Sequence, residues 1–485
     1  MTAHAATHSA VPTPMHAWKG AKPLPTLAVL SLGVFLWLFP APTALDLKTW
    51  HLFGIFVTTI FGVIAKPLPM GAIAIIAMGS CVATKTLTLE QSLSSFNSHV
   101  VWLVLLTFFM ARGFVKTGLG SRIAYLFIRT FGSSTLGLSY ALCFSDLILA
   151  PVVPSNTARG AGILFPIVNS LCIEQGSAPH DGTRRHFGAY LIKVVFQANI
   201  ITSAMFVTAL AGNPLIVSLA GELGVTMTWV SWMVAALVPG LVNLLVLPWL
   251  LYLLYPPQTK RTPHAPQMAR QQLDAMGPLS AHEKLMVGTF ISLLMLWIAG
   301  ESIAISATAA SLFGLGFLLF SGVLSWNDVL NEKTAWETLV WFAALLMMAT
   351  QLSKMGMVTW FSHEMQGAVG HFPWGWSFGI LCAVYFYSHY FFASATAHIS
   401  SMYSAFLVVI IAAGAPAGLA AMSLAVLSSL CACLTHYGTG TAPVYFGSGY
   451  VSVSEWWRLG GILSLVYLGI WSVVGGLWWK IIGLW

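Results

Sequence analysis

The sequence predicts an all-α polytopic membrane protein with about eleven transmembrane helices and two re-entrant helical hairpins in an inverted repeat. Three observations support this fold class. Of the 485 residues, 58% are hydrophobic and only 7% are charged, whereas a soluble domain has about 25% charged residues. Apolar runs of bilayer-spanning length recur along the chain, and two longer apolar regions are interrupted by small polar residues. This composition excludes a soluble globular protein and a disordered chain.

The remaining composition argues against nucleic acid, metal and cofactor. The net charge of +7 is spread over the connecting segments and does not gather on one basic face. The six cysteines lie in or beside apolar stretches, and the one close pair, Cys431 and Cys433, lacks the spacing of a zinc or redox motif. We therefore expect buried structural cysteines, no metal and no cofactor.

The apolar segments divide the chain into two membrane halves. Residues 1–23 are polar and are expected to form a disordered cytoplasmic N-terminus. The first half covers 24–255, a cytoplasmic loop covers 256–283, and the second half covers 284–485. The predicted spans are 24–40, 50–65, 69–84, 98–113, 187–211, 227–255, 284–300, 303–321, 337–353, 418–446 and 460–482.

Lysine and arginine residues predict the orientation of these spans. They precede the first span at Lys19 and Lys22, precede the fifth at Arg184 and Arg185, and gather again in the loop 256–283. All of these places lie on one side if the N-terminus is cytoplasmic. The odd number of spans then places the C-terminus on the periplasmic or extracellular side.

Two apolar regions, 134–173 and 374–412, are too long for single spans and are expected to be re-entrant hairpins. The first enters from the cytoplasm and the second from the opposite side. Irregular backbone at membrane depth is tolerated only when it is buried in protein or lines a cavity. An inverted repeat of this kind builds a binding site near the membrane midplane.

The two hairpins carry matching polar motifs at their centres. The first reads Ser-Asn-Thr-Ala-Arg over 155–159, and the second reads Ser-Ala-Thr-Ala-His over 394–398. A hairpin tip presents a helix N-terminus with free N–H groups, and the hydroxyls add short neutral donors that suit a carboxylate. The residues predicted to bind substrate are Ser155, Asn156, Thr157, Ser394, Ala395 and Thr396.

The span that follows each hairpin is broken by glycine and proline. Glycine permits unusual backbone conformations, and proline removes a donor and interrupts a helix. We therefore expect unwound backbone near mid-membrane in both spans. The residues expected there are Gly212 and Asn213 in the first half, and Gly440, Thr441 and Pro443 in the second, and these five are also predicted to bind substrate.

Arg159 is the most informative charged residue, because an arginine in a membrane segment costs about 2.5–3.5 kcal/mol on insertion scales. One interpretation is that Arg159 snorkels or pairs with Asp146, the nearest intramembrane acid. The other is a fixed positive charge beneath the substrate site. His398 occupies the matching position in the second motif, where a histidine alone would more often be a packing residue.

The motifs resemble those of the divalent anion/sodium symporter family over about residues 24–482. Within it, Ser-Asn-Thr-Ala-Arg and Phe-Phe-Ala-Ser-Ala-Thr-Ala-His resemble bacterial citrate/succinate, tartrate/succinate and 2-oxoglutarate/malate antiporters. The resemblance implies a homodimer with a scaffold and a mobile region that moves in an elevator-like way. It also implies that the hairpin residues contact substrate carboxylates beside the unwound backbone. Ala395 replaces the family's second asparagine, at one of the sodium sites of the coupled relatives.

We therefore expect a secondary transporter of the bacterial inner membrane that exchanges succinate, malate, fumarate, 2-oxoglutarate, tartrate or citrate for a counter-substrate, independently of sodium. Arg159 and His398 would supply fixed positive charge in place of a coupling cation. Moving a charged empty site works against about 2.3 kcal/mol per charge per 100 mV, which favours obligatory exchange.

Three alternatives remain. A sodium-coupled symporter of the same family is the nearest one, although intramembrane acids are scarce. A channel is the second, but two capped hairpins suit an occluded site better than an open pore. A membrane-embedded enzyme is the third and most remote: His389, His398 and His436 allow a metal site, but no hydrolase or metalloprotease motif accompanies them.

Overall fold

The computed structural model describes residues 20–180, 182–369 and 373–485. The predicted disordered N-terminus over 1–23 therefore lies mostly outside the described residues, and the first helix begins at Pro23. Within the described residues every regular element is helical, apart from an isolated bridge between Ser134 and Arg261. The predicted all-α class is confirmed.

The described helices follow one another closely in both halves. Those of the first half are α1 Pro23–Leu38, α2 Leu47–Ala65, α3 Met70–Ala83, α4 Leu89–Leu93, α5 His99–Thr117, α6 Leu119–Phe131, α7 Thr135–Leu149, α8 Phe165–Glu174, α9 Gly188–Met205, α10 Gly212–Glu222 and α11 Trp229–Leu254. Those that follow are α12 His264–Met276, α13 Ala281–Ile303, α14 Ala307–Phe320, α15 Trp326–Leu330, α16 Lys333–Lys354, α17 Met357–Val369, α18 Trp374–Ser388, α19 Ala395–Ala412, α20 Ala417–Leu430, α21 Ala442–Gly447, α22 Val453–Ile470 and α23 Gly476–Ile481. Short 3-10 or π segments are η1 Ser94–Asn97, η2 Ala158–Leu164, η3 Thr183–Arg185, η4 Val207–Ala209, η5 His389–Phe391, η6 Cys431–Cys433 and η7 Trp471–Gly475.

Each of the predicted spans coincides with an apolar helix of the structure. Eight described helices are long and apolar enough to cross a membrane, and one of them is α19, an arm of the second hairpin. The predicted spans at α1, α3, α14 and α20 are shorter apolar helices, and α20 is short because the chain unwinds after it. The number of crossings and their orientation stay predictions.

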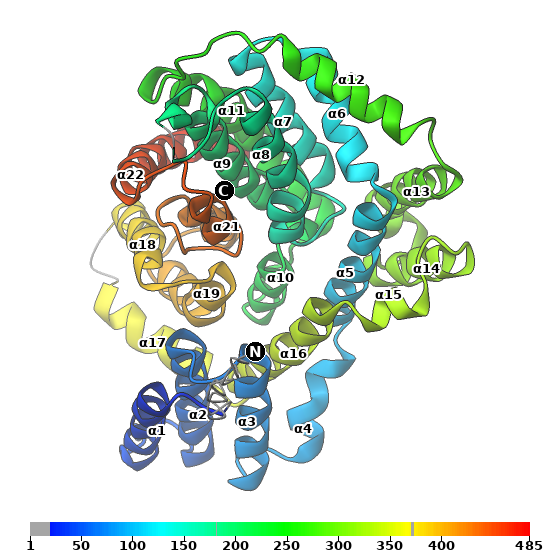
Figure 1. Ribbon diagram of the computed structural model, residues 1–485. Coiled ribbons are helices and arrows are strands. Elements are labelled where there is room, and N and C mark those ends of the chain that lie inside the picture. The colour runs from blue at the N-terminus through cyan, green and yellow to red at the C-terminus, as the bar shows by residue number, and fades with distance from the viewer. Residues whose placement is uncertain (1–19, 181, 370–372) are drawn as a thin grey trace, which may run out of the picture.

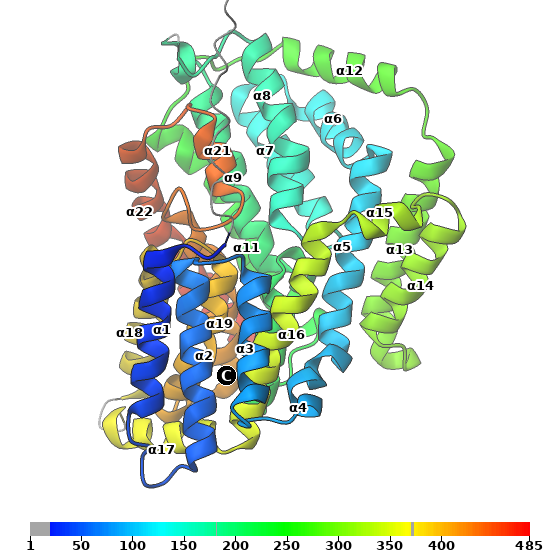
Figure 2. The ribbon, with the colours of Figure 1, turned by 60° about the horizontal axis from the view of Figure 1, so that its bottom comes forward.

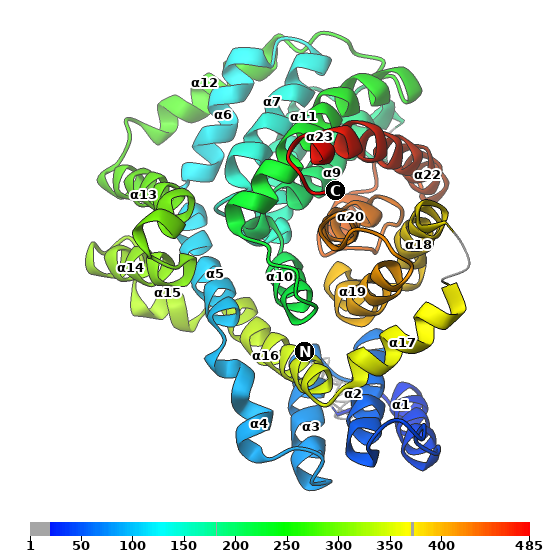
Figure 3. The same ribbon diagram turned by 180° about the vertical axis from the view of Figure 1, so that it is seen from behind.

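The interrupted segments lie together inside the bundle. Broken helix α9 packs against α20, its counterpart in the second half, and α10 packs against α19 of the second hairpin. Figure 1 shows these helices at the centre, with α1, α2, α3 and α16 to one side and α5, α13 and α14 to another. The view from behind in Figure 3 has the same central group. Both halves therefore contribute to one central region.

An amphipathic helix lies at one end of the bundle, and it was not predicted from the sequence. The polar loop predicted over 256–283 contains α12, which packs against α6 and crosses the end of the bundle in Figure 2. Helix α12 buries Ala265, Met268, Ala269 and Leu273 on one face, which is the helical spacing expected of a surface helix. Because the segment is polar overall, its helical pattern is weak in the sequence. The segment predicted as a loop is therefore largely helical.

Candidate substrate site

The two hairpin tips are built in the same way. In the first, α7 ends at Leu149 and the chain becomes helical again just after Ser155, whose hydroxyl accepts a hydrogen bond from Ala158 N–H at 3.1 Å. In the second, the Ser394 hydroxyl accepts from Ala397 N–H at 3.4 Å at the start of α19. Both serines are N-caps, which fixes a helix N-terminus at each tip. Because they are acceptors in these bonds, their own hydroxyl protons remain available as donors.

The two tips face one cavity of about 250 Å³. Its wall contains all six of the predicted substrate-binding residues of the tips, which are Ser155, Asn156, Thr157, Ser394, Ala395 and Thr396. Backbone of both broken helices completes this side through Leu210 and Ala211 in the first half and Thr439 and Gly440 in the second. The tertiary structure thus brings together two motifs that are far apart in the sequence.

Contacts between the halves hold the first tip against the second break. Asn156 Nδ2 donates to Thr439 Oγ1 at 2.8 Å, and the Tyr445 hydroxyl donates to Gly160 O at 2.8 Å. Gly440 lies directly against Thr157, and a Cβ on this glycine would overlap the Thr157 hydroxyl. The close approach of the two segments therefore requires glycine at position 440.

The breaks lie slightly earlier in the chain than predicted. The irregular segments are 206–211 and 434–441, whereas Gly212 and Asn213 belong to the first turn of α10 and Pro443 to the first turn of α21. Proline is tolerated in the first helical turn, where its missing N–H has no intrahelical acceptor. Prolines 214 and 443 therefore mark where each helix resumes. The expectation of unwound backbone is correct for Gly440 and Thr441 and wrong for Gly212, Asn213 and Pro443.

Asn213 and Thr441 lie behind the cavity wall. The Asn213 amide donates to Ser203 O and Phe206 O, both at 2.8 Å, and so satisfies carbonyl groups that the first break leaves free. Thr441 directly precedes α21 but does not cap it through its side chain, because its buried hydroxyl has no hydrogen-bond partner among the described residues. Asn213 supports the backbone beside the cavity and does not line it.

Arg159 forms a fully buried ion pair with Asp146 at 2.9 Å. Its guanidinium also donates to Val153 O at 2.9 Å in the tip, to Ala209 O at 3.1 Å in the first break and to Ser203 Oγ at 3.0 Å in α9. Of the two interpretations of Arg159, the structure contains the pair with Asp146. The side chain lies behind the tip and is not part of the cavity wall.

His398 lies at the corresponding place behind the second tip and is also fully buried. Its Nε2 is 2.9 Å from Ser388 Oγ, and its Nδ1 is 3.9 Å from Cys431 Sγ. Neither contact is a carboxylate. Like Arg159, His398 does not line the cavity.

The opposite wall of the cavity comes from helices that sequence analysis did not connect with the site. Helix α16 contributes Thr334, Glu337, Thr338 and Trp341, while α5 contributes Phe108 and α3 contributes Met70. The available signal was Glu337, an acid at the start of a predicted span with a threonine on either side within one helical turn. Only the packing of α16 against α3 and α5 shows that this face meets the hairpin tips.

The family of this chain is shown by a match over nearly its whole length. Residues 21–485 match the family described as "Sodium:sulfate symporter transmembrane region". The chain belongs to the divalent anion/sodium symporter family. The family resemblance found in the hairpin motifs is thus confirmed.

Named relatives cover nearly the whole chain. A Bacillus subtilis (strain 168) protein named "Putative malate transporter YflS" is 55% identical over 465 residues, 96% of this chain and 97% of the relative. "Dicarboxylate transporter 1, chloroplastic" of Spinacia oleracea is 49% identical over 471 residues, 96% of this chain and 83% of the relative. The "L-tartrate/succinate antiporter" of Escherichia coli O157:H7 is 34% identical over 486 residues, 96% of this chain and 98% of the relative.

Among solved structures, the crystal structure of the Alcanivorax borkumensis YdaH transporter resembles this chain with a TM-score of 0.56 and 15% identity. The likeness covers 95% of this chain and 99% of that one, and it supports the fold alone. The family and these relatives are transporters, so the enzyme alternative is wrong. The chain is a multi-pass membrane transport protein.

Proposed function

We propose that this protein is a secondary transporter that exchanges small di- or tricarboxylates across the bacterial inner membrane without sodium. The observation that carries the proposal is the cavity between the two hairpin tips, with a capped helix N-terminus and a Ser-x-Thr motif on each. Each tip would hold one carboxylate of the substrate through N–H groups and hydroxyl donors. A cavity of about 250 Å³ suits a molecule of this size.

The names of the relatives support dicarboxylates as the substrate class. Their names specify malate for the Bacillus subtilis protein, dicarboxylates for the chloroplast protein and tartrate with succinate for the antiporter. Malate is the substrate we would test first because the relative named for it is 55% identical. The hydroxyl groups and backbone donors at the tips can bind several carboxylates. We therefore expect malate, succinate, fumarate, 2-oxoglutarate, tartrate and citrate to compete for uptake.

The surroundings of Arg159 support independence from sodium. Its guanidinium is surrounded by oxygen acceptors from the tip, the first break, α7 and α9, which is an environment that would otherwise suit a bound cation. We propose that Arg159 is a tethered cation that holds the first tip to its break. Because Asp146 balances its charge, Arg159 acts mainly by positioning the tip. Behind the second tip, we propose that the matching positive charge is held in the buried group around His398.

Transport by an elevator motion fits the two-sided cavity. We place the hairpins and the broken helices in a mobile unit, and α3, α5 and α16 in the scaffold that lines the other side. We also propose a homodimer, with the N-terminus in the cytoplasm and the C-terminus on the periplasmic or extracellular side. Distance measurements between labels on α16 and α19, with and without malate, would detect the motion.

Sodium-coupled symport is the second candidate, and the family description "Sodium:sulfate symporter" favours it. The two candidates differ in whether the empty carrier can return. A symporter loads empty vesicles under a sodium gradient, whereas an exchanger requires substrate on both sides.

The deciding experiment follows labelled malate into liposomes that contain the purified protein. The liposomes are empty or preloaded with unlabelled malate, each with and without sodium. The proposal predicts uptake only into preloaded vesicles, at the same rate in either salt. Sodium-driven uptake into empty vesicles would contradict exchange and establish symport. Ser155→Ala should weaken malate uptake, and Ser170→Ala, on α8 away from the cavity, is the matched control.

A further inference from the structure

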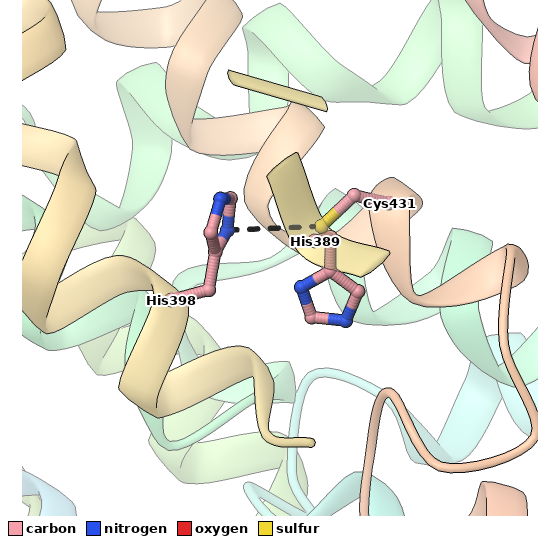
Figure 4. Close-up of side chains that lie close together, drawn as sticks. All are labelled: His389, His398 and Cys431. Atoms are coloured by element: carbon pink, nitrogen blue, oxygen red, sulfur yellow. Dashed lines mark hydrogen bonds between the residues drawn. The ribbon is translucent and has the colours of Figure 1, made fainter. Parts of the chain in front are cut away.

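A buried cluster behind the second tip is not used by the proposed transport mechanism. It consists of His389 in η5, His398 in the first turn of α19 and Cys431 at the start of η6 (Figure 4). One potential ligand atom from each residue lies within 4.8 Å of the other two. All three side chains are fully buried. His389 and His398 belong to the second hairpin, and tertiary packing brings Cys431 of the following broken helix to them.

Hydrogen bonds turn one nitrogen of each histidine toward this cluster. His389 Nε2 donates to Gly438 O at 2.9 Å, which leaves Nδ1 as the acceptor nitrogen, and this buried atom has no hydrogen-bond partner among the described residues. The Ser388 hydroxyl donates its proton to Tyr385 O at 2.8 Å, so it accepts from His398 Nε2 at 2.9 Å. His398 Nδ1 therefore also carries a lone pair, and it faces the Cys431 thiol at 3.9 Å.

This pattern is the one found around metal-binding histidines, whose outer ring nitrogen donates to a neutral or acidic oxygen while the inner nitrogen binds the ion. Two imidazole nitrogens and a thiolate suit zinc and related transition metals, whereas sodium, magnesium and calcium prefer oxygen ligands. Zinc–ligand bonds of about 2.0–2.3 Å require the three atoms to draw together by roughly 1 Å. A purely structural role would leave the buried His389 Nδ1 unpaired, which is unfavourable.

We propose that His389, His398 and Cys431 bind a zinc-class transition-metal ion that fastens the second hairpin to its broken helix. With the cysteine as thiolate, a divalent ion gives the cluster a net charge of one. That charge lies behind the second tip, as the Arg159 guanidinium lies behind the first. Only this consequence for charge rests on the proposed exchange function, since metal binding is measured without transport.

The test is a zinc titration of the full-length protein in detergent, with the bound metal counted by elemental analysis after removal of free zinc. The expected result is one tightly held zinc per chain and a rise in the midpoint of thermal unfolding. Cobalt should bind in its place and give the near-ultraviolet absorption of a cobalt–thiolate bond. Magnesium and calcium at the same concentrations should leave the unfolding midpoint unchanged.

Three variants test whether the metal binds at these residues. Cys431→Thr introduces the residue that the first half carries at the aligned position, Thr202, and should lose the cobalt–thiolate band and weaken zinc binding by more than about tenfold. His389→Gln should weaken binding by a similar factor. Cys433→Ser is the matched control, because its thiol lies in the same short helix, is directed toward Gly460 O and is outside the cluster.

Two results would overturn the proposal. One is a wild-type protein that retains no more zinc than Cys431→Thr. The other is a cobalt–thiolate band that disappears in Cys433→Ser and persists in Cys431→Thr. Size-exclusion profiles of the variants distinguish loss of the site from loss of the fold. Failure of malate exchange would leave these metal measurements standing, and absence of metal binding would leave the exchange assay standing.

Discussion

The two hairpins have the same backbone geometry, but the side chains behind their tips differ in charge. Asp146 in the first hairpin and Tyr385 in the second each precede the tip serine by nine residues, and Arg159 aligns with His398. In the broken helices, Thr202 and Cys431 each precede the proline of their break by twelve residues. The contacts correspond as well, since Arg159 and Asp146 contact Thr202 on one side while His398 contacts Cys431 on the other.

The charge distribution differs completely between these two regions. The first contains a buried guanidinium and a buried carboxylate in one hydrogen-bonded network. In the second, the Tyr385 hydroxyl meets Ser428 Oγ at 2.7 Å where the first has Asp146 and the Asn199 amide. The two repeats thus share one backbone arrangement. The first carries a cation and an anion behind its tip, whereas the second carries neutral side chains. Four predictions test this comparison between the two regions.

The largest effect is expected from removing the charge partner of the first region. Asp146→Asn leaves Arg159 buried without a counter-ion and should reduce the free energy of unfolding by about 3–5 kcal/mol. Denaturant titration in detergent, followed by tryptophan fluorescence, measures this loss. Adding Arg159→Gln to Asp146→Asn should recover part of it. Equal stability of Asp146→Asn and the wild type would show that the pair is not the anchor.

The tip serines should contribute comparably to substrate binding despite the different chemistry behind them. Ser155→Ala and Ser394→Ala each remove a donor to a carboxylate, worth about 1.5–3 kcal/mol, and a helix cap. The KM for malate exchange should rise by about tenfold or more in each variant. A large effect at one serine with none at the other would break the symmetry of the proposed site.

Gly440→Ala tests the close approach of the second break to the first tip. The added methyl would overlap the Thr157 hydroxyl, and overpacking of this kind typically costs about 1–3 kcal/mol. We expect a raised KM for malate and a free energy of unfolding that is lower by about this amount. The double variant with Thr157→Ala should relieve the overlap in the unfolding measurement, although it removes a proposed substrate contact.

The smallest effect is expected from the neutral counterpart of Asp146. Tyr385→Phe removes one hydrogen bond, while Ser428 keeps its bond to Leu424 O, so the unfolding free energy should fall by only about 0.5–1.5 kcal/mol. The same denaturant titration compares it with Asp146→Asn. A loss as large as that of Asp146→Asn would contradict the assignment of a neutral second region.

The sequence by itself determined the fold class, the approximate spans and both hairpin motifs, because hydrophobic segments and small polar tips are local features of the chain. It also fixed the pairing of Ser155 with Ser394 and of Arg159 with His398. The amphipathic α12 was missed because its polarity outweighs its helical period over a short segment. The breaks were placed slightly late because proline marks the resumption of a helix as well as its interruption.

Only the tertiary structure decided which partner each buried group contacts. The sequence offered Asp146 as one possible partner for Arg159, and packing of α7 against α9 and η2 made it the partner. The wall formed by α16, and the place of Cys431 beside His389 and His398, depend on segments that are far apart in the sequence. The motif residues indicate the local chemistry, but the counter-ion and the ligands around them come from helices that meet only on folding.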